Sequence, residues 1–286
     1  MIAKPLTIVR TIAALRAQVA TWRSAGDRVA MIPTMGALHA GHLSLVSLGR
    51  ERAERTVASI FVNPTQFAPH EDFSRYPRAL SLDLERLRAA GADLVFTPSV
   101  AEIYPSGFDT KIEIGALTQR LEGAIRPAHF AGVATVVAKL FNIVQPSRAY
   151  FGQKDAQQCV VIKKLVADLN LPLEIVIGAT VRETDGLAMS SRNAYLTPAQ
   201  RQQAPALFAA LTAAQTRYAA GERDAEALRS LVRGRLAQIP ETEIDYVSVA
   251  DPDTLVELDQ ITHGALVSVA VRFGATRLLD NVVLRG

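Results

Sequence analysis

The sequence predicts an α/β protein: a mostly parallel sheet with helices on both faces, followed by a smaller C-terminal α+β domain. Three observations lead to this prediction. Apolar runs of strand length alternate with helical patterns over the first two-thirds of the 286 residues. Two helical patterns and then three closely spaced strand patterns make up the rest. Apolar residues form 49% of the chain and charged residues 21%, which is enough apolar material for a sizeable core.

The strands expected in the first part are short apolar runs that end at Pro, Asn-Pro or Gly signals. Helical patterns separate them, so neighbouring strands are expected to pair in parallel. We expect strands at 29–32, 56–62, 94–96, 149–151 and 173–177, and helices at 42–54, 80–90, 133–144 and 156–169. In such sheets ligands bind beyond the carboxyl ends of the strands. The turns after Ile32, Val62 and Phe151 are therefore the expected binding positions.

The last third has a different pattern, with helices first and strands clustered afterwards. Helices are expected at 204–220 and 224–238, and strands at 245–249, 266–271 and 277–279. This order is typical of a small α+β domain. We therefore expect two domains, residues 1–182 and residues 183–286.

Composition excludes several classes of protein. The net charge is +3, and Lys and Arg form no stripe or tail, so no nucleic-acid partner is expected. No run approaches the roughly 18 apolar residues that cross a bilayer, and residues 1–9 lack the apolar centre of a signal peptide. The single cysteine, Cys159, lies in an apolar run and is expected to be buried. We expect a cytoplasmic protein with no membrane partner.

The first chemical motif is Pro33–Thr34–Met35–Gly36–Ala37–Leu38–His39–Ala40–Gly41–His42, between an expected strand and an expected helix. Its glycines permit close backbone approach to a ligand, and the helix N-terminus suits a phosphate. His39 and His42 are three residues apart, so both rings can point the same way. A zinc pair and a purely structural pair are alternatives. The pattern of three spaced glycines that binds dinucleotides is not met, which disfavours NAD.

The second motif, Phe151–Gly152–Gln153–Lys154–Asp155–Ala156–Gln157–Gln158, also follows a strand and opens a helix. Lys154 can place its charge on phosphate oxygens, and Asp155 can accept from ribose hydroxyls or cap the helix. By itself the pattern also fits an ordinary solvated turn.

The third motif is Met189–Ser190–Ser191–Arg192–Asn193, after Asp185–Gly186. Two hydroxyls and a guanidinium in one loop suit a polyphosphate, although an ordinary polar loop has the same composition.

Two further clusters add polar groups. Gln66, in the segment after the second strand, is expected to face a ligand, whereas Arg126 belongs either to a substrate loop or to a structural corner.

Together these segments resemble the pantothenate synthetases, the pantoate–β-alanine ligase family of the nucleotidyltransferase α/β superfamily. The matching stretches cover about two-thirds of the chain in the family's order. They are PTMGALHAGH at 33–42, FVNPTQF at 61–67, YPR at 76–78, LEGAIRP at 121–127, HFAGVATVVAKLFNIVQP at 129–146, FGQKDAQQ at 151–158 and ETDGLAMSSRNAYL at 183–196. Ala128 and Ala40 depart from the family's usual residues, but neither position supplies side-chain chemistry.

The resemblance implies a Rossmann-like domain at 1–182 that binds nucleotide and pantoate, and a small domain at 183–286 that closes over the active site. It implies attack of pantoate on the α-phosphorus of ATP, giving pantoyl adenylate and pyrophosphate. The amine of β-alanine then releases AMP and forms pantothenate. Mg²⁺ is expected with ATP, with Asp83 as a candidate ligand and the full metal site unknown. A homodimer is also implied.

The resemblance further assigns individual residues. His42 is the expected proton donor, His39 helps to hold the phosphate in the transition state, and Lys154 is the third catalytic residue. Gln66, Gln158 and Arg126 are expected to bind substrate. ATP is expected to contact Met35, Gly36, Ala37, Leu38, His39, Ala40, Gly41, His42, Gly152, Gln153, Lys154, Asp155, Val181, Met189, Ser190, Ser191 and Arg192.

Three other functions fit part of this pattern. A nucleotidylyltransferase uses a similar His-x-x-His turn but retains the adenylyl group instead of releasing AMP. A relative of class I aminoacyl-tRNA synthetases would carry a tRNA-binding extension. A non-catalytic nucleotide-binding module would not need His42, Lys154 and Ser190 together.

Overall fold

The computed structural model describes residues 5–69 and 71–285. Residues 1–4 lie outside this part, and with them the beginning of the segment 1–9 that is expected not to be a signal peptide. The chain forms two compact units. The first contains residues up to 152 and 161–178, and the second contains 153–160 and 179 onward. The predicted division at 182/183 had not placed the segment 153–160 with the C-terminal part.

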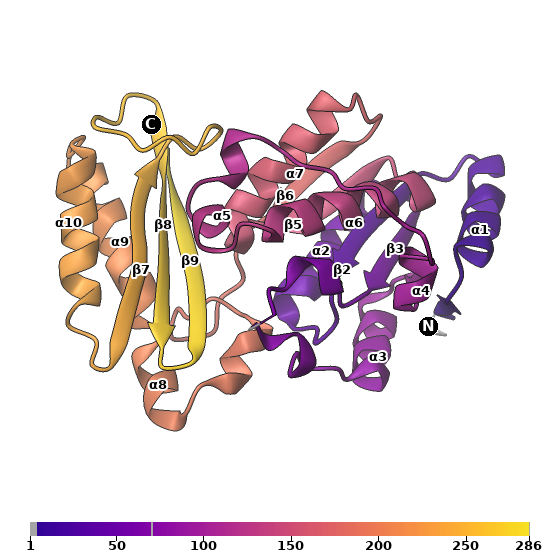
Figure 1. The fold of residues 1–286 in the computed structure, drawn as a ribbon, viewed down its shortest axis with the longest axis horizontal. Coiled ribbons are helices and arrows are strands. Elements are labelled where there is room, and N and C mark those ends of the chain that lie inside the picture. Colours follow the sequence, from indigo (N-terminus) through magenta and orange to yellow (C-terminus); the bar gives the residue numbers. More distant parts are fainter. Residues whose placement is uncertain (1–4, 70, 286) are drawn as a thin grey trace. The chain divides into compact units, whose positions relative to one another are not determined.

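The first unit is built on a six-stranded parallel sheet with the order β1-β4-β3-β2-β5-β6 (Figure 1). The strands are β1 (Thr7–Val9), β2 (Val29–Thr34), β3 (Arg55–Ile60), β4 (Leu94–Phe96), β5 (Arg148–Gly152) and β6 (Glu174–Gly178). The order runs one way from β2 to β4 and the other way from β5 to β6. The strands that end at the predicted binding turns, β3, β2 and β5, are therefore neighbours, as the prediction requires.

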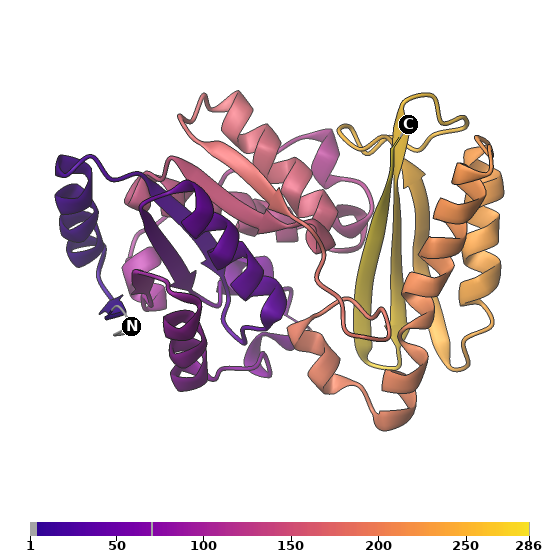
Figure 2. The same ribbon diagram turned by 180° about the vertical axis from the view of Figure 1, so that it is seen from behind.

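Helices cover both faces of this sheet, which confirms the predicted α/β class. Helix α6 lies in front of the sheet in Figure 1 and contacts α1, whereas α2 lies in front in Figure 2 and contacts α3. The helices are α1 (Ile12–Ser24), α2 (Ala40–Arg52), α3 (Leu80–Ala90), α4 (Val100–Ile103), α5 (Glu122–Ile125), α6 (His129–Val144) and α7 (Ala156–Asp168). The 3₁₀ helices are η1 (Pro64–Gln66), η2 (Asp72–Ser74), η3 (Ala116–Thr118), η4 (Gln153–Asp155) and η5 (Ser191–Tyr195).

Two details differ from the sequence prediction. Pro33 lies inside β2, although we expected it to end that strand. It is tolerated because β2 pairs with β5 only at Ala30 and Met31, so the missing N–H of Pro33 removes no ladder bond on that side. Strand β1 and helix α1 were not predicted at all. Thr11 caps α1 by accepting from Ala14 N at 3.2 Å.

The second unit contains a three-stranded antiparallel sheet, β7-β8-β9, packed against helices. Its elements are α8 (Pro198–Gln203), α9 (Ala206–Ala219), α10 (Ala225–Leu236), β7 (Thr242–Ala250), β8 (Gly264–Phe273) and β9 (Thr276–Arg285). Leu228, Val232 and Leu236 recur at four-residue spacing, so α10 buries one apolar face against the sheet. The predicted α+β class is confirmed for this part, although β9 is much longer than the expected 277–279.

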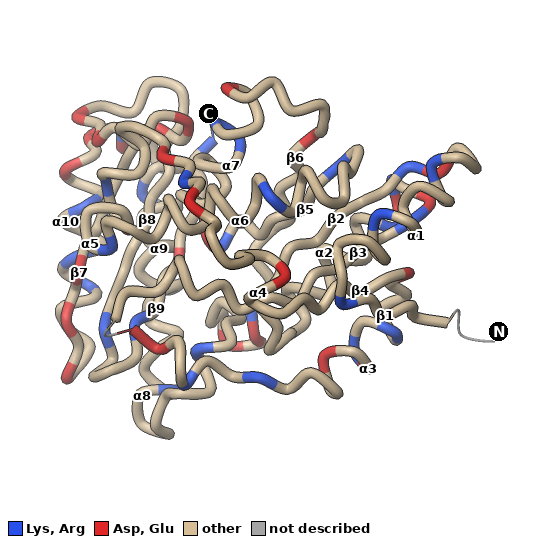
Figure 3. The backbone as a smooth tube through the Cα atoms, turned by 45° about the vertical axis from the view of Figure 1, so that its right-hand side comes forward, with Lys and Arg blue, Asp and Glu red and all other residues tan. Residues whose placement is uncertain are grey.

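Charge and burial follow the composition. Lys and Arg are interspersed with Asp and Glu over the described part of both units (Figure 3). Cys159 is buried, as predicted. Within the described residues, every helix is too short or too polar to cross a membrane.

Candidate active site

The turn after β2 is held by one buried carboxylate. Asp83, on α3, is 1% exposed, and its two oxygens accept from Ala37 N and Leu38 N, each at 2.8 Å. Gly36 has φ +84°, and a Cβ there would lie 3.0 Å from Asp83 Oδ2. Gly36 therefore allows the close approach of Asp83, and its contact with a ligand stays a prediction. The N–H groups of Ala37 and Leu38 are likewise bonded to protein, so any nucleotide contact made by these residues involves other atoms.

His39 and His42 lie at the start of α2 with their ring centroids 4.1 Å apart, so the prediction that both rings share one side of the turn is confirmed. His39 is the N-cap residue, and its N–H donates to His42 Nδ1 at 3.3 Å. A neutral imidazole that accepts at Nδ1 carries its proton on Nε2. His42 therefore presents an N–H donor from its other ring nitrogen, which suits a residue that stabilises a developing negative charge.

Gln66, after β3, has a fixed amide orientation. Asn63 Nδ2 donates to Gln66 Oε1 and to Gly132 O, both at 3.1 Å. The hydroxyl of Tyr104 donates to Asn63 Oδ1 at 2.9 Å, which fixes the Asn63 amide in turn. Gln66 Nε2 lies 3.0 Å from Met35 Sδ, a weak acceptor. The amide can thus offer a donor to an incoming carboxylate or hydroxyl, and the structure brings the predicted residues Met35 and Gln66 together.

Helix α6 approaches this segment closely because it has a glycine at the contact. A Cβ on Gly132 would lie 2.4 Å from Thr65 O, well inside contact distance. Any side chain there would force α6 away from η1 and break the hydrogen bond from Asn63 to Gly132 O. Gly132 therefore allows α6 to support the Gln66 segment.

Arg126 and His129 also support the Gln66 segment in this structure. Arg126 Nε and Nη2 bind Glu71 Oε1 and Oε2 at 2.5 and 2.7 Å, and Nη2 also donates to Gln66 O at 3.2 Å. Burial alone would raise the pKa of Glu71, but the Arg126 guanidinium outweighs it and holds that pKa below its ordinary value. Of the two alternatives for Arg126, the observed contacts are those of a structural corner. Its role in substrate binding stays a prediction.

His129 is neutral in this environment. Burial, and then the nearby Arg126 charge, lower the pKa of His129 to about 4. Its Nδ1 lies 2.9 Å from Gln66 O, so Nδ1 carries the proton and donates. This bond adds a second donor to the Gln66 carbonyl.

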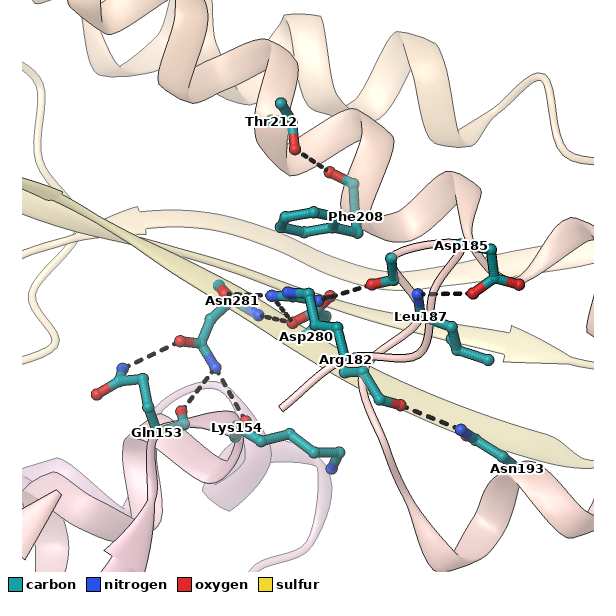
Figure 4. Close-up of polar contacts among 12 residues, drawn as sticks. Gln153, Lys154, Arg182, Asp185, Leu187, Asn193, Phe208, Thr212, Asp280 and Asn281 are labelled. Atoms are coloured by element: carbon teal, nitrogen blue, oxygen red, sulfur yellow. Dashed lines mark hydrogen bonds and ion pairs between the residues drawn. The ribbon is translucent and has the colours of Figure 1, made fainter. Parts of the chain in front are cut away.

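The turn after β5 belongs to the second unit and is held by strand β9. Asn281 Nδ2 donates to Gln153 O at 3.0 Å and to Lys154 O at 2.9 Å, and Gln153 Nε2 donates to Asn281 Oδ1 at 3.0 Å (Figure 4). The Lys154 side chain extends away from Asn281, and its Nζ lies 3.3 Å from Asp155 Oδ1. A Cβ on Gly152, the last residue of β5, would meet no atom within 4 Å. Gln158 follows in the first turn of α7 and is half-buried.

The segment 181–193 carries the remaining predicted contacts. Met189 N donates to Val181 O at 3.0 Å, so the two expected neighbours of the nucleoside lie side by side. Ser190 caps η5 by accepting from Arg192 N at 3.2 Å. Arg182 anchors the segment through a bidentate ion pair with the buried Asp280, at 2.6 and 3.0 Å (Figure 4).

The described residues do not form a metal site made of protein side chains alone. Among the described residues, no three His, Cys, Asp or Glu side chains are grouped so that they could hold a metal ion. Asp83, the expected Mg²⁺ ligand, uses both oxygens on backbone amides. Mg²⁺ commonly binds through substrate phosphates and water with few protein ligands, so we assign no step to it.

Several residues that shape the site were missed in the sequence. Asn63 was expected to end a strand and to lie in the ligand-facing segment 63–67, but with no role of its own, and Tyr104 and Asn281 were not predicted to contribute. Asn63 follows a strand end and precedes Pro64, which is a turn signal that could have marked it. The partners of Asn281 lie 127 and 128 residues away, so no local signal could mark it.

Comparison with known proteins decides the family. The pantoate–β-alanine ligase profile matches residues 7–283. The chain belongs to the pantoate–β-alanine ligase family. The pantothenate synthetase of Herpetosiphon aurantiacus is 58% identical over 280 residues, covering 98% of this chain and all of the relative. That of Chloroflexus aggregans is also 58% identical, with the same coverage.

Solved structures agree. Pantothenate synthetase from Thermus thermophilus superposes with a TM-score of 0.92 at 47% identity, covering 96% of this chain and 98% of that one. Pantoate–β-alanine ligase from Francisella tularensis, complexed with beta-gamma ATP and beta-alanine, superposes with a TM-score of 0.81 at 30% identity, covering 98% of each chain. The resemblance drawn from the sequence motifs is confirmed.

Proposed function

We propose that this chain condenses pantoate with β-alanine at the expense of ATP, giving pantothenate, AMP and pyrophosphate. In the first step a pantoate carboxylate oxygen bonds to the α-phosphorus, and the bond from that phosphorus to the pyrophosphate oxygen breaks. In the second step the β-alanine nitrogen bonds to the acyl carbon, AMP leaves with the shared oxygen, and the amine loses a proton. Such chemistry depends on positioning and charge stabilisation more than on covalent catalysis.

The first unit supplies the residues proposed to act on the reacting groups. His42 offers an Nε2–H donor, which suits the negative charge that develops on phosphate oxygens. His39 packs against its ring and shares that role. Gln66 offers its Nε2–H group to pantoate, because its Oε1 already accepts from Asn63. These contacts are the observation that carries the proposal: a donor pair and a fixed amide at the carboxyl ends of neighbouring strands.

The second unit supplies the residues proposed to bind the nucleotide and part of pantoate. Lys154 is assigned to the phosphates, Asp155 to the ribose and Gln158 to pantoate. Met189 and Val181 are assigned to the nucleoside, which agrees with their pairing through the backbone. Ser190, Ser191 and Arg192 are assigned to the phosphates. Mg²⁺ bound with ATP, a homodimeric assembly and a cytoplasmic location complete the proposal, and each rests on the family resemblance.

The test is AMP formation that depends on both pantoate and β-alanine, with pantoate-dependent exchange between ATP and pyrophosphate as the readout of the first step. His39→Ala and Lys154→Ala should each lower the exchange rate by about a hundredfold or more, because each removes a group proposed to stabilise the transition state. The exposed residues His263 and Lys163 provide matched controls, and their alanine variants should keep the rate.

Circular dichroism and thermal unfolding should show that all four variants fold. Absence of exchange with pantoate in the unmutated protein would contradict the proposed reaction. Full exchange in a folded His39→Ala or Lys154→Ala variant would contradict the role of that residue only.

A further inference from the structure

Strand β9 contributes the buried side-chain amide of Asn281. All of its hydrogen bonds go to the turn Gln153–Asp155, which we call the Lys154 turn. Asn281 is 4% exposed. Both donors of its Nδ2 group are used, on Gln153 O at 3.0 Å and Lys154 O at 2.9 Å, and its Oδ1 accepts from Gln153 Nε2 at 3.0 Å (Figure 4). An amide has both a donor and an acceptor end, which is what this arrangement requires. Alanine would supply neither, and aspartate would place its oxygens against two carbonyl oxygens.

These bonds orient two peptide groups. In a trans peptide the C=O and the following N–H point in opposite directions. Because the carbonyls of Gln153 and Lys154 point toward Asn281, the N–H groups of Lys154 and Asp155 point away from β9. The negative ends of both peptide dipoles are thus turned toward a neutral side chain, and their positive ends are turned to the other side, which favours an anion there.

Asn281 is itself firmly held. Its backbone N–H donates to Asp280 Oδ1 at 2.8 Å, and Asp280 is 3% exposed. Asp280 binds Arg182, whose guanidinium carbon lies 3.6 Å from the ring centroid of Phe208. Adjacent residues of one strand therefore fix the two segments of the second unit that are proposed to bind ATP: Asn281 the Lys154 turn, and Asp280 the segment after Arg182.

We propose that Asn281 is a positioning residue for nucleotide binding, acting through the Lys154 turn. This inference rests on the proposed role of Lys154 toward the ATP phosphates. If Asn281 sets the place of Lys154 and the direction of the neighbouring N–H groups, its loss misplaces both. A displacement of about 1 Å can cost a factor of about a hundred.

The experiment measures ATP affinity by calorimetry, together with kcat and KM for ATP, in Asn281→Ala and Asn281→Asp. We expect Asn281→Ala to weaken ATP binding about tenfold or more. Asn281→Asp should weaken it further, because its carboxylate oxygens would face the carbonyl oxygens of Gln153 and Lys154 and can donate to neither. Val282→Ala, in the same strand, is the control for a general loss of stability, since Val282 packs in the core of this unit. It should leave ATP affinity unchanged at a comparable melting temperature.

A double-mutant cycle separates this inference from the proposed function. If Asn281 acts through the Lys154 turn, the loss of ATP affinity in the double variant Lys154→Ala/Asn281→Ala should be smaller than the sum of the two single losses. The inference is overturned if Asn281→Ala binds ATP normally, if Val282→Ala loses as much affinity, or if the two single losses add in full. Normal ATP binding by Lys154→Ala would instead overturn the role of Lys154.

Discussion

Two turns of this chain leave a parallel strand and begin a helix, but opposite kinds of group hold them. Asp83, an anion, accepts from the N–H groups of Ala37 and Leu38 after β2. Asn281, a neutral amide, donates to the carbonyls of Gln153 and Lys154 after β5. In the first turn, therefore, the side chain that holds the turn binds backbone N–H groups. In the second turn it binds backbone carbonyl groups.

The difference shows that the side chain holding a turn decides which backbone groups of that turn can bind a ligand. In the first turn the N–H groups of Ala37 and Leu38 are bonded to a buried carboxylate, and the groups that we propose to act on the ligand are the side chains of His39 and His42. In the second turn the carbonyl groups of Gln153 and Lys154 are bonded to Asn281. The N–H groups on the opposite side and the Lys154 side chain can therefore face an anion. Ionisable groups also hold the Gln66 segment of the first unit, through Arg126 and His129. The following predictions test this contrast.

The largest expected effect is at Asp83. Asp83→Ala leaves the N–H groups of the half-buried Ala37 and the buried Leu38 without their charged acceptor, so the free energy of unfolding should fall by about 3 kcal/mol or more. Urea denaturation measures it. Glu85, an exposed acid on the same helix, is the matched control, and Glu85→Ala should change stability little. Equal losses in the two variants would mean that Asp83 does not hold the turn.

The next effect is a pH dependence that belongs to the first unit. The pKa of His129 is about 4 in the folded protein against an ordinary value of 6.5. Between these values the unfolded chain binds a proton that the folded chain does not, so stability falls as the pH drops from about 6.5 to about 4. The total is on the order of 1–3 kcal/mol.

Thermal unfolding across this pH range should show a shallower dependence for His129→Gln than for the unmutated protein. The exposed His263 provides the control through His263→Gln. Profiles that stay parallel for His129→Gln and the unmutated protein would refute the role of His129.

The smallest effect compares the glycines of the two turns. Gly36→Ala must adopt a positive φ and place Cβ 3.0 Å from Asp83 Oδ2, so it should lose about 1–2 kcal/mol of stability. Gly152→Ala adds a methyl group into open space and should change stability by less than about 0.5 kcal/mol. If ATP lies against Gly152, however, this variant should raise KM for ATP. An unchanged KM would remove Gly152 from the nucleotide contacts.

Much of the fold could be predicted because its signals are local. Helix α3 and strand β4 were predicted with the bounds that the structure has, since an amphipathic pattern ending at Gly91 and an apolar run are properties of consecutive residues. Helix α1 carried equally local signals, a Thr11 cap and apolar residues at Leu15, Val19 and Trp22, but was overlooked. The contact between His39 and His42 followed from helical spacing alone.

The sequence by itself determined which segments carry the chemistry, because strand ends, glycines and polar side chains are recorded in the order of residues. Only the tertiary structure decided what holds those segments. Asp83 reaches its turn across 45 and 46 residues, and Asn281 reaches its turn across 127 and 128. Such contacts depend on strand order and on how helices pack over a sheet. Those features arise from burying apolar surface across the whole domain, which no single stretch of sequence specifies.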